Sequence, residues 1–362
     1  MVARSDSSLE LDDASQVAKA IAALRAGQLV GLPTETVYGL AARGDDADAV
    51  QRIFAAKGRP ASNPLILHVA DVAAAEACFS PTFWDGDQGG VLRERFELLS
   101  RFWPGPITLV GLKHERIPSI VTAGLSTVGV RVPQHPLALK LLRQCEFPLA
   151  APSANPSNYV SPTKAEHVRK SLGDRVAVVL DGGDCDVGVE STIVDLGFAE
   201  ASTSNTLSTV RILRPGGVTL EQIRAALPGH AVDFRVETNA ERPTAPGQFA
   251  KHYSPQTPVV LVEPTKGMPE PAVGPVAGPP TSRVLRLALS DATAASCRGY
   301  ADVWSLSSDG DPKEVARRLY AMLRLADESG FDRIDVETGS HGSLGEAILD
   351  RLRRCASPAK GE

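Results

Sequence analysis

The stretch QLVGLPTETVYG, residues 28–39, joins a short apolar run to a turn rich in polar side chains. The apolar half predicts a buried β-strand, which Pro33 ends because proline has no N–H group for a β-ladder. The turn supplies two hydroxyls and a carboxylate, from Thr34, Glu35 and Thr36. These groups either hold a polar ligand or cap the turn, and the stretch taken alone favours the cap.

Helical patterns lie on both sides of this strand. One runs over residues 12–26, before Gly27, and the other over residues 45–57, before Gly58 and Pro60. Aspartates can cap the start of each pattern, and glycine and proline do not continue a helix. The strand is therefore expected between two helices.

The same signals extend through residues 1–227. Apolar runs predict strands at 65–69, 126–132, 176–180, 191–196 and 209–213. Helical patterns occur at 135–145, at 163–172 with a Thr163–Glu166 capping box, and from Thr219. Residues 85–90 resemble a loop insertion. Since strands and helices do not alternate strictly, we expect an α/β domain with a twisted, mixed sheet.

A different organisation follows after residue 227. The pattern weakens over residues 228–257, which we interpret as a linker. Residues 258–356 then predict a small, Rossmann-like parallel α/β domain, because strands alternate with helices. Its strands are expected at 259–262, 283–289, 302–306 and 334–336, its helices at 311–328 and 345–354, and a mobile loop at 264–280.

The composition excludes several classes of protein. A chain of 362 residues favours two domains, and a net charge of −5 argues against a general nucleic-acid coat protein. The five cysteines are scattered without Cys-x-x-Cys spacing, so we expect reduced thiols and no metal site built from protein ligands. No apolar stretch reaches membrane-spanning length, and the N-terminus has no apolar core, so a cytoplasmic location is expected.

Polar residues gather at the predicted strand ends, where ligands of open α/β sheets usually bind. Lys57 and Arg59 place two cations where a helix stops, and we expect both to be accessible there. Such a pair suits phosphate groups, although cations at this position also complement a helix dipole. The chain has no Walker-type phosphate loop. Arg131 ends an apolar strand and therefore needs an anion, either a protein carboxylate or a substrate. His68 also ends such a strand, where a lone histidine is more often part of the core.

In combination these motifs resemble the YrdC-type threonylcarbamoyl-AMP synthase family in its long, two-domain form. The resemblance covers residues 15–225 and continues through the linker nearly to the end of the chain. Its motifs, in order, are Pro33-Thr-Glu-Thr-Val-Tyr-Gly-Leu, Lys57-x-Arg59 with Asn63-Pro-Leu-Ile, Trp103-Pro-Gly-Pro, Ala151-Pro-Ser-Ala-Asn, Gly188-Val-Glu-Ser-Thr-Ile, Leu213-Arg-Pro-Gly and, in the linker, Ala245-Pro-Gly with His252-Tyr-Ser-Pro.

The resemblance implies a positively lined cavity with two sets of binding residues. The set for ATP is Lys57, Arg59, Asn63, Thr127, Ser153, Asn155, Ser161, Arg214 and Tyr253. The set for L-threonine is Thr36, His68, Arg131, Ala151 and Ser191. In this reading Arg131 finds its anion in the threonine carboxylate, and the linker closes over the nucleotide as a lid.

The implied reaction joins L-threonine, bicarbonate and ATP into threonylcarbamoyl-AMP and pyrophosphate. It needs no covalent nucleophile, since positioning and charge stabilisation suffice, and Lys57 and Arg59 with Mg²⁺ are the expected catalytic groups. The product is expected to pass to a tRNA threonylcarbamoyl-transferase complex, with weak or no direct RNA binding by this chain.

Two rival functions make different predictions. Hydrogenase-maturation carbamoyltransferases contain related domains, but they carry zinc-finger regions whose Cys-x-x-Cys pairs this chain lacks. A module that binds double-stranded RNA would use a basic concave surface, for which an acidic chain with few aromatic residues is a poor candidate.

Overall fold

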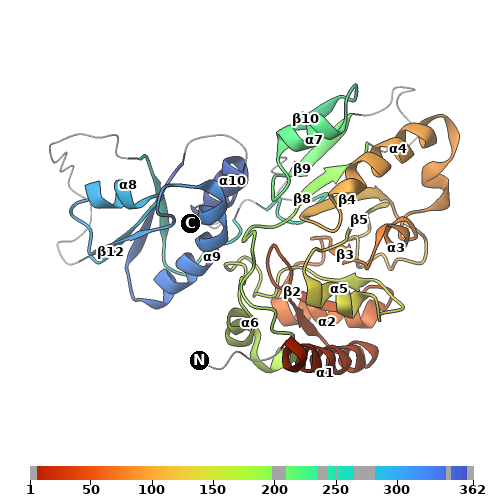
Figure 1. Cartoon of the computed structure of the whole chain (residues 1–362), viewed down its shortest axis with the longest axis horizontal. Coiled ribbons are helices and arrows are strands. Elements are labelled where there is room, and N and C mark those ends of the chain that lie inside the picture. Colours follow the sequence, from red (N-terminus) through yellow and green to blue (C-terminus); the bar gives the residue numbers. More distant parts are fainter. Residues whose placement is uncertain are drawn as a thin grey trace.

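The computed structural model describes residues 6–197, 209–234, 243–249, 251–264, 282–339 and 344–356. In these ranges the strands form a ten-stranded mixed sheet and a four-stranded parallel sheet. Figure 1 shows the two sheets in separate units, with helices α9 and α10 of the second unit on the side that faces β8 and β9 of the first. We call them the N-terminal and the C-terminal unit. The expected α/β class with two sheets is confirmed.

The ten-stranded sheet has the order β10-β9-β8-β4-β5-β3-β6-β2-β1-β7. At its centre β3 pairs in parallel with β5, and their register sets His68 opposite Arg131. Two polar residues of the predicted site are thus neighbours on adjacent strands. The strands are β1 Val30–Leu32, β2 Gly39–Arg43, β3 Ile66–His68, β4 Ile107–Leu112, β5 Thr127–Arg131, β6 Leu149–Ala150, β7 Val178–Val179, β8 Thr192–Asp195, β9 Val210–Arg214 and β10 Val232–Phe234.

Helices cover this sheet and bury its apolar side chains. Helix α2 illustrates how the local sequence sets its limits. The Asp46 carboxylate accepts hydrogen bonds from the first turn, and Gly58 ends the helix in the left-handed conformation at φ +61°. The helices are α1 Asp6–Arg25, α2 Ala47–Lys57, α3 Val72–Glu76, α4 Gly86–Leu99, α5 Pro136–Leu142, α6 Ala165–Leu172 and α7 Leu220–Ala226, with short 3₁₀ turns at Pro81–Trp84, Ser100–Phe102 and Gly173–Arg175.

Two predictions at helix starts are wrong. Helix α1 begins at Asp6 rather than near residue 12, because the leucines and glutamate before Asp12 are good helix formers. The expected Thr163–Glu166 capping box does not form, since α6 begins at Ala165 and Lys164 takes the cap position. The Thr163 hydroxyl is buried without a hydrogen-bond partner.

Two segments expected to be irregular are regular instead. Residues 85–90 are not a loop insertion, because α4 starts at Gly86. Its residues Leu92, Phe96 and Leu99 are buried at helical spacing in the main core, which stabilises the glycine-rich first turn. Strand β10 lies inside the segment expected as a linker and pairs in parallel with β9, at the end of the sheet order.

The C-terminal unit has the parallel topology expected from its sequence, with the order β11-β14-β12-β13. Apart from Pro264, the loop expected at 264–280 lies outside the described residues. Among the described residues no helix is both long and apolar enough to cross a bilayer. The elements are β11 Val259–Val262, β12 Val284–Ala288, α8 Asp291–Ser296, β13 Asp302–Ser305, α9 Pro312–Glu328, β14 Arg333–Glu337 and α10 Gly345–Ala356.

The two units share a buried contact at the Gly188-Val-Glu-Ser motif. Val189 belongs to the same apolar cluster as Leu319 and Tyr320 of α9. Gly188 adopts φ +76°, and a Cβ atom there would lie 2.4 Å from the Ala316 carbonyl oxygen. Glycine is therefore required for this close approach of α9. The motif predicted to bind substrate also forms the contact between the units.

Candidate active site

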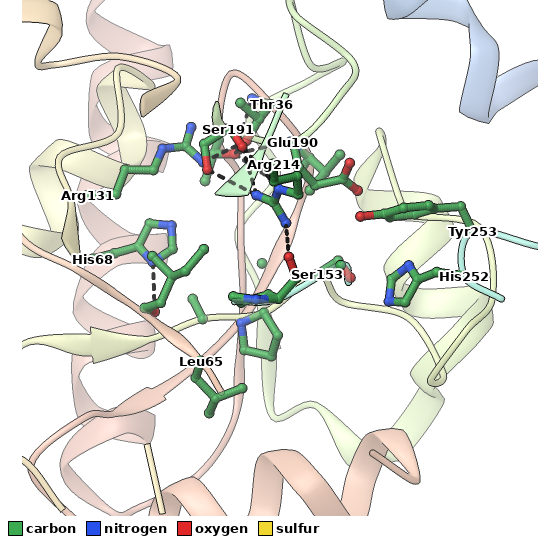
Figure 2. A pocket seen from close by; sticks show the side chains of 18 of the residues that line it. Thr36, Leu65, His68, Arg131, Ser153, Glu190, Ser191, Arg214, His252 and Tyr253 are labelled. Carbon is green, nitrogen blue, oxygen red and sulfur yellow. Dashed lines mark hydrogen bonds between the residues drawn. The ribbon is translucent and has the colours of Figure 1, made fainter. Parts of the chain in front are cut away.

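A cavity lies at the ends of β3 and β5, between the turn after β1 and the linker (Figure 2). Its volume is about 50 Å³, which has room for a few water molecules but not for a nucleotide. The linker residues Pro246, Gly247, His252 and Tyr253 form part of its wall. The structure therefore shows the site with the linker packed over it.

Most residues of the two predicted binding sets line this single cavity. The sequence places them on seven separate stretches, and the fold brings them together. Their roles toward each ligand stay predictions. The predicted residues in the wall are Thr36, Arg59, His68, Arg131, Ala151, Ser153, Ser191, Arg214 and Tyr253.

Five predicted residues lie outside this wall. Asn63 is buried, and its carbonyl oxygen accepts a hydrogen bond from Arg59. Thr127 lines a smaller neighbouring cavity, which is also walled by Pro246 of the linker. Ser161 donates to the carboxylate of Glu190, which lines the cavity. The other two are Lys57 and Asn155.

Lys57 is bound to the backbone of the loop that carries Ser153 and Asn155. Its Nζ donates to the Ser153 carbonyl at 2.6 Å and to the Asn155 carbonyl at 2.5 Å. Lys57 and Arg59 are 3% and 8% exposed, so the expectation that they are accessible at a helix end is wrong. Helix α2 ends under the loop rather than at the surface. Burial, together with the charge of Arg59, lowers the pKa of Lys57 well below its ordinary value.

Arg59 and Arg214 are buried cations that contact carbonyl oxygens. Arg59 donates to the Asn63 and Pro64 carbonyls, and Arg214 donates to those of Ser191 and Pro246. Among the described residues neither forms an ion pair with a carboxylate. Burial lowers the pKa of Arg59 to about 9 and also lowers that of Arg214. A buried cation without an anion is unfavourable, so the cavity is suited to a polyanion.

Arg131 already has an anionic partner in the protein. Its Nη2 lies 2.7 Å from Oε1 of Glu35 as an ion pair, and both side chains are almost fully buried. Its Nη1 also donates to the Thr36 hydroxyl at 2.8 Å. The expectation that Arg131 finds its anion only in the substrate is therefore wrong. The turn after β1 carries Glu35 directly to the end of β5.

His68 and the turn after β1 complete one end of the cavity. Burial, with a smaller contribution from the charge of Arg131, lowers the pKa of His68 to about 3, so the imidazole is neutral at physiological pH. The Thr34 hydroxyl accepts hydrogen bonds from the backbone N–H groups of Thr36 and Val37. The capping interpretation of this turn is therefore confirmed for Thr34. Thr36 lines the cavity, and its contact with a ligand stays a prediction.

The linker is held over the cavity by hydrogen bonds and stacking. The Pro246 carbonyl accepts from Arg214, and the Gln248 side chain caps the turn at Thr244. Tyr253 is 1% exposed and stacks on Tyr320 of α9 at a centroid distance of 5.7 Å. The predicted lid residue is therefore buried between the two units.

Two carboxylates of the site were not predicted as partners of arginines. Glu35 was noted only as one of the polar groups of its turn, and Glu190 was passed over for its hydroxyl neighbours. Both are buried and paired with arginines, Arg131 and Arg351. The available signal for Glu35 was a carboxylate placed just after a predicted buried strand, in a turn already expected to carry polar groups. No sequence signal indicated a role at the site for Arg351, since it lies on an ordinary amphipathic helix.

Comparison with known proteins accounts for nearly the whole chain. Residues 22–216 match the family model of Sua5, YciO and YrdC proteins, described as "Telomere recombination". Residues 218–357 match the model described as "Threonylcarbamoyl-AMP synthase, C-terminal domain". The chain belongs to the long, two-domain form of the YrdC-type threonylcarbamoyl-AMP synthase family.

Individual members of this family align over almost their full length. The threonylcarbamoyl-AMP synthase of Bacillus subtilis is 39% identical over 94% of this chain and 93% of its own. That of Pyrococcus abyssi is 37% identical over 92% of both chains. The crystal structure of P. abyssi Sua5 complexed with L-threonine superposes with a TM-score of 0.76 at 33% identity, covering 94% of each chain.

The closed linker leads to a prediction about ligand entry. A cavity of about 50 Å³ cannot admit ATP unless residues 243–256 move. We expect ATP with threonine to slow hydrogen exchange in this segment about tenfold or more, because bound phosphates pair with Arg59 and Arg214 beneath it. Mass spectrometry of amide exchange would measure this effect, with β12 as the internal control. Equal exchange with and without ligands would identify the segment as a static tether.

Proposed function

We propose that this chain synthesises L-threonylcarbamoyladenylate from L-threonine, bicarbonate and ATP, with release of pyrophosphate. The observation that carries the proposal is a pair of buried cations in the wall of one cavity, Arg59 and Arg214, both bound to carbonyl oxygens. A third buried cation, Lys57, lies outside the wall and donates to the carbonyl of the wall residue Ser153. A polyphosphate supplies the negative charge that these groups lack. The family relationship indicates which reaction takes place, namely transfer of the AMP part of ATP to a carbamate made from threonine. The cavity is consistent with this reaction.

The chemistry balances without a covalent enzyme intermediate. The threonine amine attacks the carbon of bicarbonate, and loss of water leaves a carbamate. A carbamate oxygen then attacks the α-phosphorus of ATP while pyrophosphate departs. Arg59 and Arg214 stabilise charge on the phosphates, and Arg131 with Thr36 positions threonine. The packed linker excludes water from the labile carbamate.

The donor set of the cavity indicates how Mg²⁺ would enter. Glu190 is the carboxylate in the described part of the wall, and Arg351, Tyr320 and Ser161 already occupy its oxygens. No group of three or more His, Cys, Asp or Glu side chains suited to a metal occurs in the described ranges. Mg²⁺ typically binds through substrate phosphates and water. We therefore propose that it arrives as the magnesium complex of ATP.

A pyrophosphate-release assay tests the proposed reaction. We expect release only when threonine, bicarbonate and Mg·ATP are all present, because the carbamate must form before the α-phosphorus is attacked. Serine in place of threonine and omission of bicarbonate are the controls. Release that ignores threonine would indicate simple ATP hydrolysis and contradict the proposal.

We propose that the product passes to a tRNA threonylcarbamoyl-transferase complex and that the reaction takes place in the cytoplasm. Support for the location comes from five unpaired cysteines, four of them buried, which fits a reducing compartment. Direct RNA binding is expected to be weak, since the net charge is −5. An RNA mobility shift at physiological salt would test this, and tight binding would favour an RNA-binding function.

A further inference from the structure

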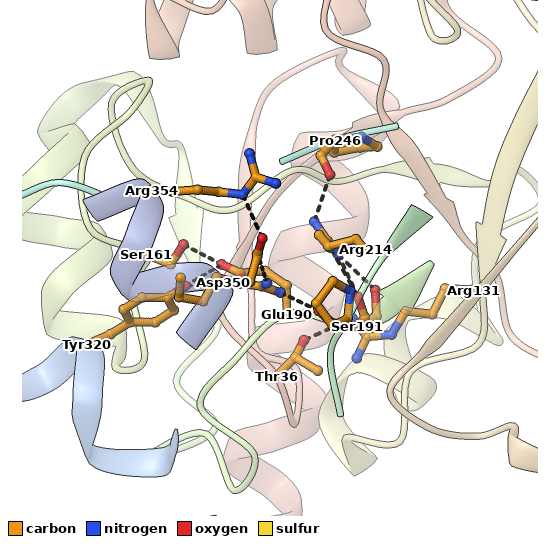
Figure 3. Close-up of polar contacts among 12 residues, drawn as sticks. Thr36, Arg131, Ser161, Glu190, Ser191, Arg214, Pro246, Tyr320, Asp350 and Arg354 are labelled. Carbon is orange, nitrogen blue, oxygen red and sulfur yellow. Dashed lines mark hydrogen bonds and ion pairs between the residues drawn. The ribbon is translucent and has the colours of Figure 1, made fainter. Parts of the chain in front are cut away.

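Glu190 of the N-terminal unit is surrounded by donors from both units (Figure 3). Its Oε1 accepts a hydrogen bond of 2.7 Å from the hydroxyl of Ser161, a predicted ATP contact. Its Oε2 accepts two hydrogen bonds, one of 3.0 Å from the hydroxyl of Tyr320 on α9 and one of 2.7 Å from Nε of Arg351 on α10. One carboxylate thus joins a site residue to two helices of the C-terminal unit.

Arg351 connects the same point to the linker and to the strand that carries Arg214. Its Nη2 donates to the carbonyl of Pro215, the residue after β9, at 2.9 Å. Its guanidinium lies 5.2 Å from the ring centroid of Tyr253, which stacks on Tyr320 on its other side. A single buried arginine of α10 therefore contacts the carboxylate, the strand end and the lid residue together.

Each unit supplies only part of the contacts of these buried groups. Glu190 is 7% exposed, Tyr320 0% and Arg351 1%, so without the other unit Glu190 would keep only Ser161, and Arg351 would keep Asp350 but lose Glu190. Burial by itself would raise the pKa of Glu190, but the charges of Arg351 and Arg214 outweigh it and hold the pKa at about 2. The Glu190 carboxylate is therefore ionised at physiological pH, and Arg351 of the C-terminal unit balances its negative charge.

A second arginine of the C-terminal unit fixes the backbone on the other side of Ser161. Arg324 of α9 donates to the carbonyls of Ser161 and Val160, at 3.3 and 2.5 Å. The side chain of Ser161 is thus oriented by Glu190 and its backbone by Arg324. Both constraints depend on helices that contribute no residue to the cavity wall described above.

We propose that Glu190 is a positioning residue of the nucleotide site, and that the C-terminal unit completes this site through Arg351 and Tyr320 without contacting substrate. The inference rests on the proposed function. Glu190 holds Ser161, and through Arg351 and Tyr320 it holds Tyr253 over the nucleotide. The groups predicted for threonine at the far end, His68 and Arg131, have their own contacts and do not depend on this cluster.

The test separates ATP binding from threonine binding in the full-length protein. For Glu190→Gln and Arg351→Met we expect ATP affinity to fall tenfold or more by calorimetry. Threonine affinity measured without ATP should stay within about twofold. The KM for ATP should rise more than kcat falls. Equal losses for both ligands would reduce the cluster to a structural contact and overturn the proposal.

A matched control separates positioning from loss of stability. Arg286 and Glu337 form another buried ion pair, at 2.9 Å, between β12 and β14 within the C-terminal unit. Glu337→Gln is expected to lower the melting temperature at least as much as Glu190→Gln while leaving ATP affinity unchanged. If Glu337→Gln weakens ATP binding equally, general destabilisation explains the result and the proposal fails.

Two further variants keep the proposal falsifiable. Tyr320→Phe removes one hydroxyl and keeps the stacking on Tyr253. The variant should therefore fold, and its affinity for ATP should fall about threefold or more. The Glu190→Gln/Arg351→Met double variant should bind ATP no more weakly than the worse single variant, because both act through one contact. Unchanged affinity in Tyr320→Phe together with additive losses in the double variant would overturn the proposal. Absence of ATP binding by the wild-type chain would instead contradict the proposed function.

Discussion

Changing Arg59 to methionine is expected to lower pyrophosphate release by about 10²-fold or more while the protein stays folded. Methionine keeps the apolar volume and removes a buried charge that contacts carbonyl oxygens. The Asn63 and Pro64 carbonyls lose a donor from the same segment, but no carboxylate among the described residues is left unpaired. The melting temperature should therefore fall by several degrees, less than in Lys57→Met, whose lost contacts join α2 to a distant loop. Steady-state assays with thermal melts would measure both effects.

The control for this change lies on α2, the helix that ends just before Arg59. Arg52 is exposed on α2 and donates to the Gly27 carbonyl at 2.7 Å, so Arg52→Met should leave the rate unchanged. Lys57→Met is expected to differ from both variants. The Nζ of Lys57 donates to two carbonyls of the 153–155 loop, so loss of activity should come with lower stability. A normal rate in Arg59→Met would remove this residue from the site.

Arg131→Gln should weaken threonine binding by about 2–5 kcal/mol, as expected when one partner of a buried charged contact is removed. The ion pair with Glu35 complicates the single change, because that carboxylate would stay buried without its cation. We therefore also expect a loss of stability of about 3–5 kcal/mol. Calorimetry with threonine and denaturant unfolding would measure the two effects separately.

The Glu35→Gln/Arg131→Gln double variant distinguishes the two effects. It removes both charges of the pair, so most of the lost stability should return while threonine binding stays weak. ATP binding measured without threonine should change far less in all these variants. Recovery of threonine binding in the double variant would show that Arg131 acts only by neutralising Glu35.

Local signals in the sequence predicted many elements closely. Helix α9 begins at Pro312, capped by Asp311, and ends at Glu328 as expected, and β11 spans the predicted residues 259–262. Elements whose pattern is weak were missed, such as β2 and α4. Gly39–Arg43 has no alternation because the strand is buried on both faces, and the glycine-rich start of α4 hides a helix that its core contacts stabilise.

The sequence by itself determined the fold class, the family and which motifs carry polar groups, because caps, strand periodicity and motif order are properties of short stretches. Only the tertiary structure decided how the charges are paired. Glu190 and Arg351 are 161 residues apart, and Arg131 meets Glu35 across the sheet. Ion pairs between distant residues depend on the path of the chain and on burial, which raises the energetic cost of every unpaired charge. For this reason the partner of Arg131 and the burial of Lys57 emerged only from the packing of the N-terminal unit, and two partners of Glu190 only from the contact between the units.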